Sequence, residues 1–259
     1  MFAFPYLVEI LTPRRSSPQP VEAEMGRFAE KYQRILDAGY GISIPDNPMG
    51  RPRFSALEAI ESCRLPISST RLMMNLNTFH SKSELDSILD KAAAVGIEFL
   101  LIVRGDGGPA LSRLEPAEIG GKRSVPTSMD LLRYINTTRA GCFITGAAFN
   151  PYTPASFERD KLEEKIAAGA RFAVTQPLIG RNPHVDRLAD LNIPVVVEAW
   201  MSENVELLFK SVGKTREQVG AYDPVENLRA LHKAYPASCV YLSMLSFTQE
   251  WSVILPRTR

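Results

Sequence analysis

Three polar residues interrupt or end segments that are otherwise apolar. Glu9 lies within Leu7-Val-Glu-Ile-Leu11, Asp106 follows an apolar run that ends at Val103, and Gln176 ends Phe172-Ala-Val-Thr-Gln176. A carboxyl group surrounded by aliphatic side chains has a raised pKa, because burial disfavours its charged form, and it can donate a proton near neutral pH. A second, ionised carboxylate would stabilise a substrate that becomes cationic. The pattern therefore favours a general acid beside an electrostatic stabiliser.

Each of these residues also has a purely structural interpretation. Glu9 could form an ion pair within the wall of a sheet. Asp106 could close a turn by accepting hydrogen bonds from the amides of Gly107 and Gly108. Gln176, taken alone, indicates a structural role more readily than a functional one.

Other candidate motifs fail on spacing. Gly213-Lys-Thr215 ends like a phosphate-binding loop, but Leu208 stands where the first glycine of that motif is required. The three histidines are scattered without zinc-ligand spacing, so no metal site is predicted. No serine or cysteine lies in a nucleophile elbow, and Cys142 falls in an expected strand, which predicts a core position.

The elements that would position these residues alternate between short apolar runs and longer amphipathic ones. Helix signals are clear in places: Ser81 and Glu84 have the spacing of a capping box ahead of an apolar stripe. Helices are expected at about 21–37, 54–62, 82–94, 127–138, 157–168, 183–191, 202–211 and 222–234. The eight expected strands are Tyr6–Leu11, Gly41–Ile44, Arg71–Leu76, Glu98–Val103, Gly141–Ala147, Arg171–Thr175, Pro194–Glu198 and Cys239–Leu242.

Eight strand-then-helix units without a break in composition predict one α/β domain over residues 1–259, a closed (β/α)₈ TIM barrel. An open doubly wound sheet is less consistent, because the segment after the first strand lacks a glycine-rich turn. The long connection between Arg104 and Pro126 follows the fourth strand. In a barrel it would lie over the carboxyl-terminal mouth, where active sites are built.

Composition narrows the classes of partner. The chain has 259 residues with 30 Lys and Arg against 29 Asp and Glu, so nothing indicates the concentrated positive charge that nucleic-acid binding needs. No apolar stretch is long enough to span a membrane. Three cysteines, widely separated and without a CxxC pair, are typical of reduced thiols in a cytoplasmic protein.

Five segments, taken together, resemble the methylenetetrahydrofolate reductase family in order and spacing. The similarity covers about residues 6–180 and continues more weakly to residue 250. The most specific of the five segments is the one that ends at Pro177. The segments are Val8-Glu-Ile-Leu-Thr-Pro-Arg14, Leu101-Ile-Val-Arg-Gly-Asp106, Ser128-Met-Asp-Leu-Leu132, Gly146-Ala-Ala-Phe-Asn-Pro151 and Lys165-Ile-Ala-Ala-Gly-Ala-Arg-Phe-Ala-Val-Thr-Gln-Pro177.

This resemblance implies a TIM barrel that reduces 5,10-methylenetetrahydrofolate to 5-methyltetrahydrofolate, or runs the reverse oxidation in one-carbon catabolism. It implies Glu9 as the general acid, Asp106 as a charge near pterin and flavin, and Gln176 as a pterin-binding amide. The electron donor would be NADH or NADPH, and a homo-oligomer is compatible with the family.

The resemblance further implies a flavin site, for FAD in many members, with FMN or no flavin as the alternatives. Asn75 stands near the place of a flavin-contacting histidine and Thr127 replaces a tyrosine, so flavin binding of moderate or weak affinity is expected. Phe247 lies near the place of an arginine that holds the folate tail in some members. The residues expected to bind the cofactor are Asn75, Arg104, Gly105, Thr127, Ser128, Ala147, Phe149 and Lys165.

Two alternatives from other functional classes remain open at this point. One is a pterin-binding or methyltetrahydrofolate-binding barrel that transfers methyl groups without redox chemistry, and the other is an accessory barrel in a larger complex. Glu9 separates them from the reductase, because transfer of a formed methyl group needs no acid to open a ring.

Overall fold

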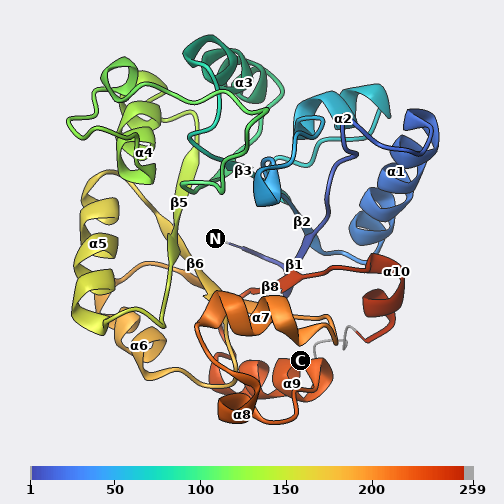
Figure 1. Cartoon of the computed structure of the whole chain (residues 1–259), viewed down its shortest axis with the longest axis vertical. Helices are drawn as coiled ribbons and strands as arrows, with labels where there is room; N and C mark the ends of the chain where they lie inside the picture. The colour runs from blue at the N-terminus through green and yellow to red at the C-terminus, as the bar shows by residue number, and fades with distance from the viewer. Residues whose placement is uncertain (1, 254–259) are drawn as a thin grey trace.

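The computed structural model describes residues 2–253 and forms a closed barrel of eight parallel strands in sequential order. Figure 1 shows the strands around a central axis with the helices outside them. The strands are β1 (Tyr6–Glu9), β2 (Gly41–Ile44), β3 (Leu72–Leu76), β4 (Phe99–Ile102), β5 (Ile144–Phe149), β6 (Phe172–Pro177), β7 (Val195–Trp200) and β8 (Val240–Ser243).

The helices follow the strands as expected for this fold. Short 3₁₀ segments lie at Pro48–Gly50, Pro116–Ile119, Arg187–Leu191 and Trp251–Val253. The α-helices are α1 (Val21–Asp37), α2 (Ala56–Ser62), α3 (Lys82–Ala94), α4 (Ser128–Thr138), α5 (Ala155–Ala167), α6 (Pro183–Asp186), α7 (Val205–Val212), α8 (Arg216–Val219), α9 (Pro224–Ala234) and α10 (Phe247–Glu250).

The predicted barrel and all eight predicted strands are confirmed, but several boundaries differ. The fifth strand begins at Ile144 rather than Gly141, because Gly141 adopts a positive φ of 76° in the turn that ends α4. Cys142 therefore lies in that turn and is exposed, so its predicted core position is wrong. The short helices α8 and α10 were not predicted, since four residues carry too little periodicity to be recognised.

Two apolar layers follow from the alternation of side chains along each strand. Tyr6 and Val8 of β1 pack outward in the main core between the strands and the helices. Leu7 packs inward with residues of six other segments, and this inner cluster is Phe4, Leu7, Met73, Phe99, Leu101, Phe172, Val174, Val196, Cys239 and Tyr241.

Aromatic rings close the barrel at the ends where the strands begin. The Phe2 ring centroid lies 4.9 Å from that of Phe99 and 5.3 Å from that of Phe172. Gly146 of β5 leaves the space that the Phe172 ring occupies, because a Cβ atom there would lie 2.2 Å from that ring. This end of the barrel is therefore filled with side chains.

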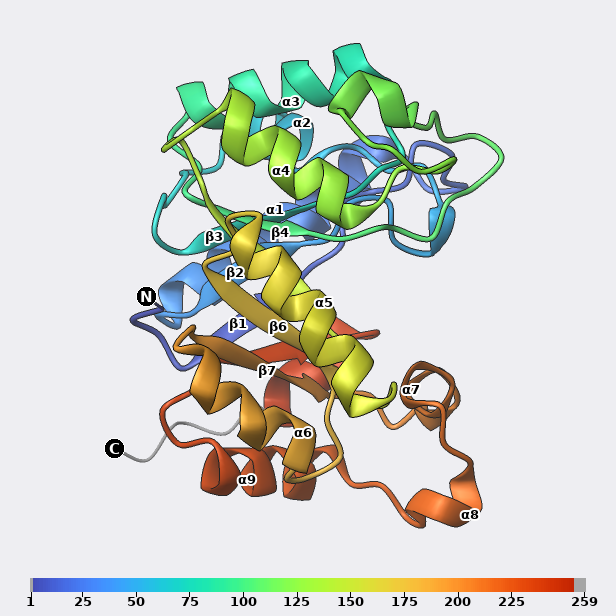
Figure 2. The same ribbon diagram turned by 90° about the vertical axis from the view of Figure 1, so that its left-hand side faces the viewer.

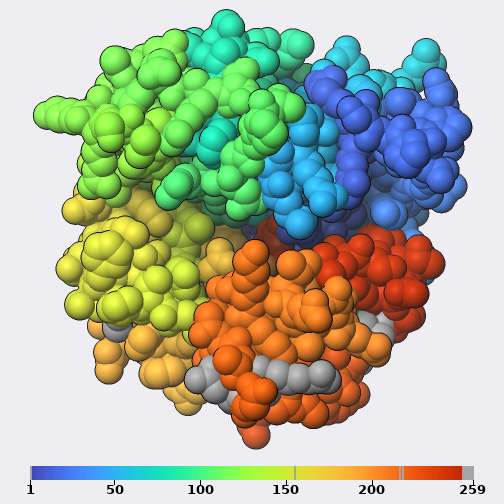
Figure 3. All heavy atoms as spheres, in the orientation of Figure 1, coloured from blue at the N-terminus to red at the C-terminus, as the bar shows by residue number. Residues whose placement is uncertain are grey.

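The loops that follow the strands gather at the opposite end, which Figure 2 shows from the side. Two of them touch backbone to backbone: a Cβ atom on Gly50 would lie 1.6 Å from the carbonyl oxygen of Gly107. The long connection after β4 also donates a hydrogen bond from Leu114 N to Thr78 O, at 3.1 Å. It thereby covers the β2-to-β4 sector of the mouth, while the middle of this face stays hollowed (Figure 3).

Candidate active site

Glu9 lies at the last position of β1 and faces the barrel interior, two residues beyond inward-facing Leu7. Its Oε2 atom accepts a hydrogen bond of 2.6 Å from the Tyr241 hydroxyl of β8. Burial raises the pKa of Glu9 to about 7, although the Tyr241 hydrogen bond and the charge of Arg53 act in the opposite direction. The carboxyl group can therefore carry a proton near neutral pH and still release it.

A second carboxyl group, that of Glu198 on β7, lies close enough to Glu9 for their charges to interact. Its Oε1 atom accepts a hydrogen bond from the Ser243 hydroxyl. Burial raises the pKa of Glu198 to about 8, the Ser243 hydrogen bond lowers it, and the charge of Glu9 raises it further. Sequence reasoning missed this residue, although Val195-Val-Val-Glu-Ala-Trp200 carries the same signal as the segment around Glu9: one charge within an apolar strand.

Tyr241 connects these groups to the opposite side of the barrel mouth. Burial raises the pKa of its phenol well above the ordinary value, and the charges of Glu9 and Glu198 act in the same direction, so it stays protonated and serves as a donor. Ser43 of β2 hydrogen-bonds toward it and also donates to Asn75 Oδ1 of β3 at 3.3 Å. The polar network therefore reaches from β7 to β3.

Gln176 lies near the end of β6, two positions after inward-facing Val174, and is half-buried where the pairing of β6 with β7 is irregular. Asp106 lies instead on the exposed rim. Its Oδ2 atom accepts a hydrogen bond of 2.7 Å from the amide of Met49, a residue that is 60% exposed and has a positive φ of 60°. Asp106 thus binds the loop after β2 rather than the interior of the barrel.

Two of the polar residues expected to bind flavin already have hydrogen-bond partners within the protein. Thr127 caps α4 and its hydroxyl donates to Asp130 at 2.7 Å, while Lys165 Nζ donates to Ala148 O at 2.7 Å. Burial lowers the pKa of Lys165.

The other expected flavin-binding residues offer few additional groups. Ala147 and Phe149 pack outward in the main core, and Gly105 lies against Asn77. Arg104 is exposed and Ser128 is half-buried at the start of α4. As placed, these side chains do not fit a flavin cradle, so no chemical step is derived through flavin.

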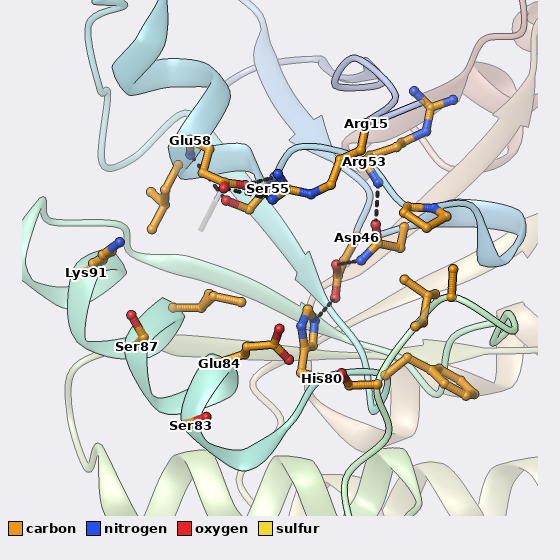
Figure 4. Close-up of a pocket in the computed structure, with 18 of the residues that line it drawn as sticks. Arg15, Asp46, Arg53, Ser55, Glu58, His80, Ser83, Glu84, Ser87 and Lys91 are labelled. Atoms are coloured by element: carbon orange, nitrogen blue, oxygen red, sulfur yellow. Dashed lines mark hydrogen bonds and ion pairs between the residues drawn. The ribbon is translucent and has the colours of Figure 1, made fainter. Parts of the chain in front are cut away.

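A separate cavity of about 470 Å³ lies between the loop after β2, α2 and α3 (Figure 4). At its edge, His80 Nε2 lies 2.7 Å from Asp46 Oδ2, and both side chains are about nine-tenths buried. Burial alone would lower the pKa of His80, but the hydrogen bond to Asp46, the charge of Asp46 and the charge of Glu84 outweigh it and raise the pKa. This ion pair joins two of the loops at the mouth, and it does not include the residues singled out from the sequence.

Two further findings concern the described part of the chain. Within residues 2–253, no three His, Cys, Asp or Glu side chains are grouped so that they could hold a metal ion. Over the same range, no helix has the length and apolar character needed to cross a bilayer.

The fold and this site define a (β/α)₈ barrel with two buried carboxyl groups and a glutamine at its carboxyl-terminal mouth. The family model of methylenetetrahydrofolate reductase matches residues 18–189, about two thirds of the chain. The chain therefore belongs to the methylenetetrahydrofolate reductase family, a folate-related reductase family. Asp106 and Gln176 lie inside the matched region, whereas Glu9 precedes it.

Solved structures with the same fold have little sequence in common with this chain. A 2,3-dimethylmalate lyase aligns with a TM-score of 0.52 at 10% identity, over 95% of this chain and 78% of that one. Dihydropteroate synthase of Coxiella burnetii aligns with a TM-score of 0.49 at 12% identity, over 98% and 92%. At 10% identity, the likeness to the lyase shows the barrel fold alone. Among curated proteins, no sequence matches the chain.

Proposed function

We propose that this protein is a methylenetetrahydrofolate reductase that converts 5,10-methylenetetrahydrofolate to 5-methyltetrahydrofolate, or catalyses the reverse oxidation. Family membership supports the substrate class. The observation that carries the reaction is Glu9, a carboxyl group inside the barrel mouth with a pKa of about 7. A proton held there is available at the pH at which the ring of the substrate must open.

The proposed step begins with proton transfer from Glu9 to N10 of the folate. The bond between N10 and the bridging methylene carbon then breaks, its electron pair stays on N10, and N5 carries the methylene group as an iminium cation. A hydride from the electron donor completes the methyl group. One proton and one hydride are consumed, and Glu9 is reprotonated from solvent.

The neighbours of Glu9 support this role physically. The Tyr241 hydroxyl occupies Oε2 of Glu9, which leaves Oε1 for the substrate. Gln176, near the end of β6, would bind the pterin through its amide. Asp106 would contribute negative charge from the rim of the mouth, because charge stabilisation is usually the largest single term in catalysis.

We propose NADH or NADPH as the electron donor, used as the second substrate. The partners already formed by Thr127 and Lys165 favour weak binding of FAD or FMN, or none. The same observation favours the second candidate function, a folate-binding methyl-transfer or accessory barrel without redox chemistry.

Glu9→Gln tests the proposal, with Glu22→Gln on the exposed start of α1 as the matched control. Glutamine keeps the shape but cannot donate the proton, so turnover of methylenetetrahydrofolate should fall about 10²-fold or more. Binding of 5-methyltetrahydrofolate, measured by calorimetry, should remain. Loss of binding would make Glu9 a structural residue, and unchanged turnover would remove it from the mechanism. Binding without any reductase activity in the unsubstituted protein would favour the methyl-transfer alternative.

Tyr241→Phe gives an independent test of Glu9 as the general acid. Removing the hydroxyl takes away a hydrogen bond that favours the charged form of Glu9, so the pKa of Glu9 should rise further. The alkaline limb of the pH–rate profile should then move to higher pH. A limb that stays in place would mean that another group supplies the proton.

A further inference from the structure

A second hollow at the mouth is strongly cationic. It has a volume of about 390 Å³ and is formed by the segment that follows β1, the first turns of α1 and Arg53. Four of its lining residues are cations, Arg14, Arg27, Lys31 and Arg53, and we call it the cationic cavity. Glu24 is the one carboxylate among its lining residues, so the formal charge around the cavity is strongly positive.

The cations of this cavity are poorly compensated within the protein. Arg27 lies 3.9 Å from Glu24, the outer limit of an ion pair, and Glu24 also accepts a hydrogen bond of 2.6 Å from Ser17. Among residues 2–253, no carboxylate lies within ion-pair distance of Lys31 or Arg53. Burial lowers the pKa of Lys31, and the charges of Arg27 and Arg53 lower it further, which is the sign of mutual repulsion.

Two buried polar atoms at the cavity also lack a partner. Arg53 Nε and Thr12 Oγ1 are buried and have no hydrogen-bond partner among the described residues. The rest of the Arg53 guanidinium is held in place, because Nη1 donates to the carbonyl oxygen of Thr12. Buried donors without acceptors are rare in native proteins, and each one needs an explanation. An anion in the cavity would supply both the missing acceptor and the missing negative charge.

We propose that the cationic cavity binds a ligand with several negatively charged oxygens, carboxylates or phosphates, that reaches it from the barrel mouth. Arginine side chains match both groups, since the guanidinium donates two parallel hydrogen bonds to them. Thr12 follows Glu9 by three residues, a path of about 10 Å at most. One end of a ligand bound at Glu9 can therefore extend into the cavity.

Two sources could supply this anion. The glutamyl tail of a folate carries carboxylates, and a nucleotide carries phosphates. The first source rests on the proposed function, whereas the anion site itself does not.

The test compares two double variants that remove the same charge. Arg27→Gln/Lys31→Gln removes two cations of the cavity and leaves Arg53 and Thr12 in place. Arg133→Gln/Lys233→Gln removes two exposed cations from α4 and α9, away from the cavity. Circular dichroism establishes that both variants fold, and calorimetry measures binding of tripolyphosphate, tetrahydropteroate, and the mono- and triglutamate forms of 5-methyltetrahydrofolate.

We expect tripolyphosphate to bind, with an affinity at least tenfold lower in the cavity variant and unchanged in the control. If the tail is the source, the triglutamate should bind at least tenfold more tightly than tetrahydropteroate, and the cavity variant should lose that gain. Equal binding of all folates together with tripolyphosphate binding would identify a phosphate ligand. If no folate binds but the cavity variant still loses tripolyphosphate, the proposed function fails and the anion site stands. Absence of anion binding, or equal losses in both variants, would overturn the inference.

Discussion

Replacing Glu198 by glutamine should make the folded protein less sensitive to high pH. The pKa of Glu198 rises from an ordinary value of 4.5 to about 8 on folding, mainly because of burial. Above pH 4.5 the unfolded chain releases this proton while the folded protein retains it. Unfolding therefore becomes easier as pH rises from about 4.5 to 8, and above that the charged group remains in an unfavourable environment.

The magnitude follows from the two pKa values of Glu198. One pKa unit corresponds to about 1.36 kcal/mol, so the full difference sets an upper value of about 5 kcal/mol. Because Glu198 and Glu9 share part of this effect, we expect Glu198→Gln to remove about 3 kcal/mol of the pH dependence. The glutamine Oε1 atom can still accept the Ser243 hydrogen bond, so the variant should fold.

Urea unfolding at pH 5.5 and pH 9 measures this prediction. In the unsubstituted protein and in the Glu22→Gln control, the free energy of unfolding should be lower at pH 9 than at pH 5.5. In Glu198→Gln this decrease should be clearly smaller. Histidine titration cancels in the comparison, because His80 is common to all three proteins. If Glu198→Gln changes stability equally at both pH values, then Glu198 does not keep its proton in the folded state and the reasoning from burial is wrong.

Three further outcomes are expected. Gly146→Ala should destabilise the barrel by about 3 kcal/mol in urea unfolding, because the new Cβ would meet the Phe172 ring, and a loss below about 0.5 kcal/mol would contradict this packing. Asp46→Ala should cost about 3 kcal/mol at pH 5.5, since it removes the buried partner that stabilises the protonated ring of His80. That loss should shrink at pH 9, as the raised pKa of His80 stabilises the fold only while the ring is protonated. The purified protein should show no stoichiometric flavin absorption, and a full complement of tightly bound flavin would refute the account of Thr127 and Lys165.

The sequence predicts the barrel because apolar runs and amphipathic runs alternate eight times, and backbone geometry then determines which ends of the strands meet. It also identifies Glu9 and Gln176, whose polar side chains interrupt buried strands. The same rule applied to Val195-Val-Val-Glu-Ala-Trp200 identifies Glu198 as well. The Asp106–Met49 contact could not be predicted, because it depends on two loops meeting where Gly50 and Gly107 lack side chains. The cationic cavity could not be predicted either, because its residues come from separate segments that meet only in the folded protein.

The aromatic rings at the closed end of the barrel have a consequence for the order in which the chain folds. Phe2 packs against Phe99 of β4 and Phe172 of β6, so its native contacts join residues that are far apart in the sequence. Contacts between residues so far apart in the chain form slowly, because a large loop must close before they contribute. During synthesis, Phe2 lacks its Phe172 partner until β6 has left the ribosome. A half barrel ending after β4 would therefore expose Phe2 and Phe4, and it should aggregate or bind chaperones rather than fold by itself.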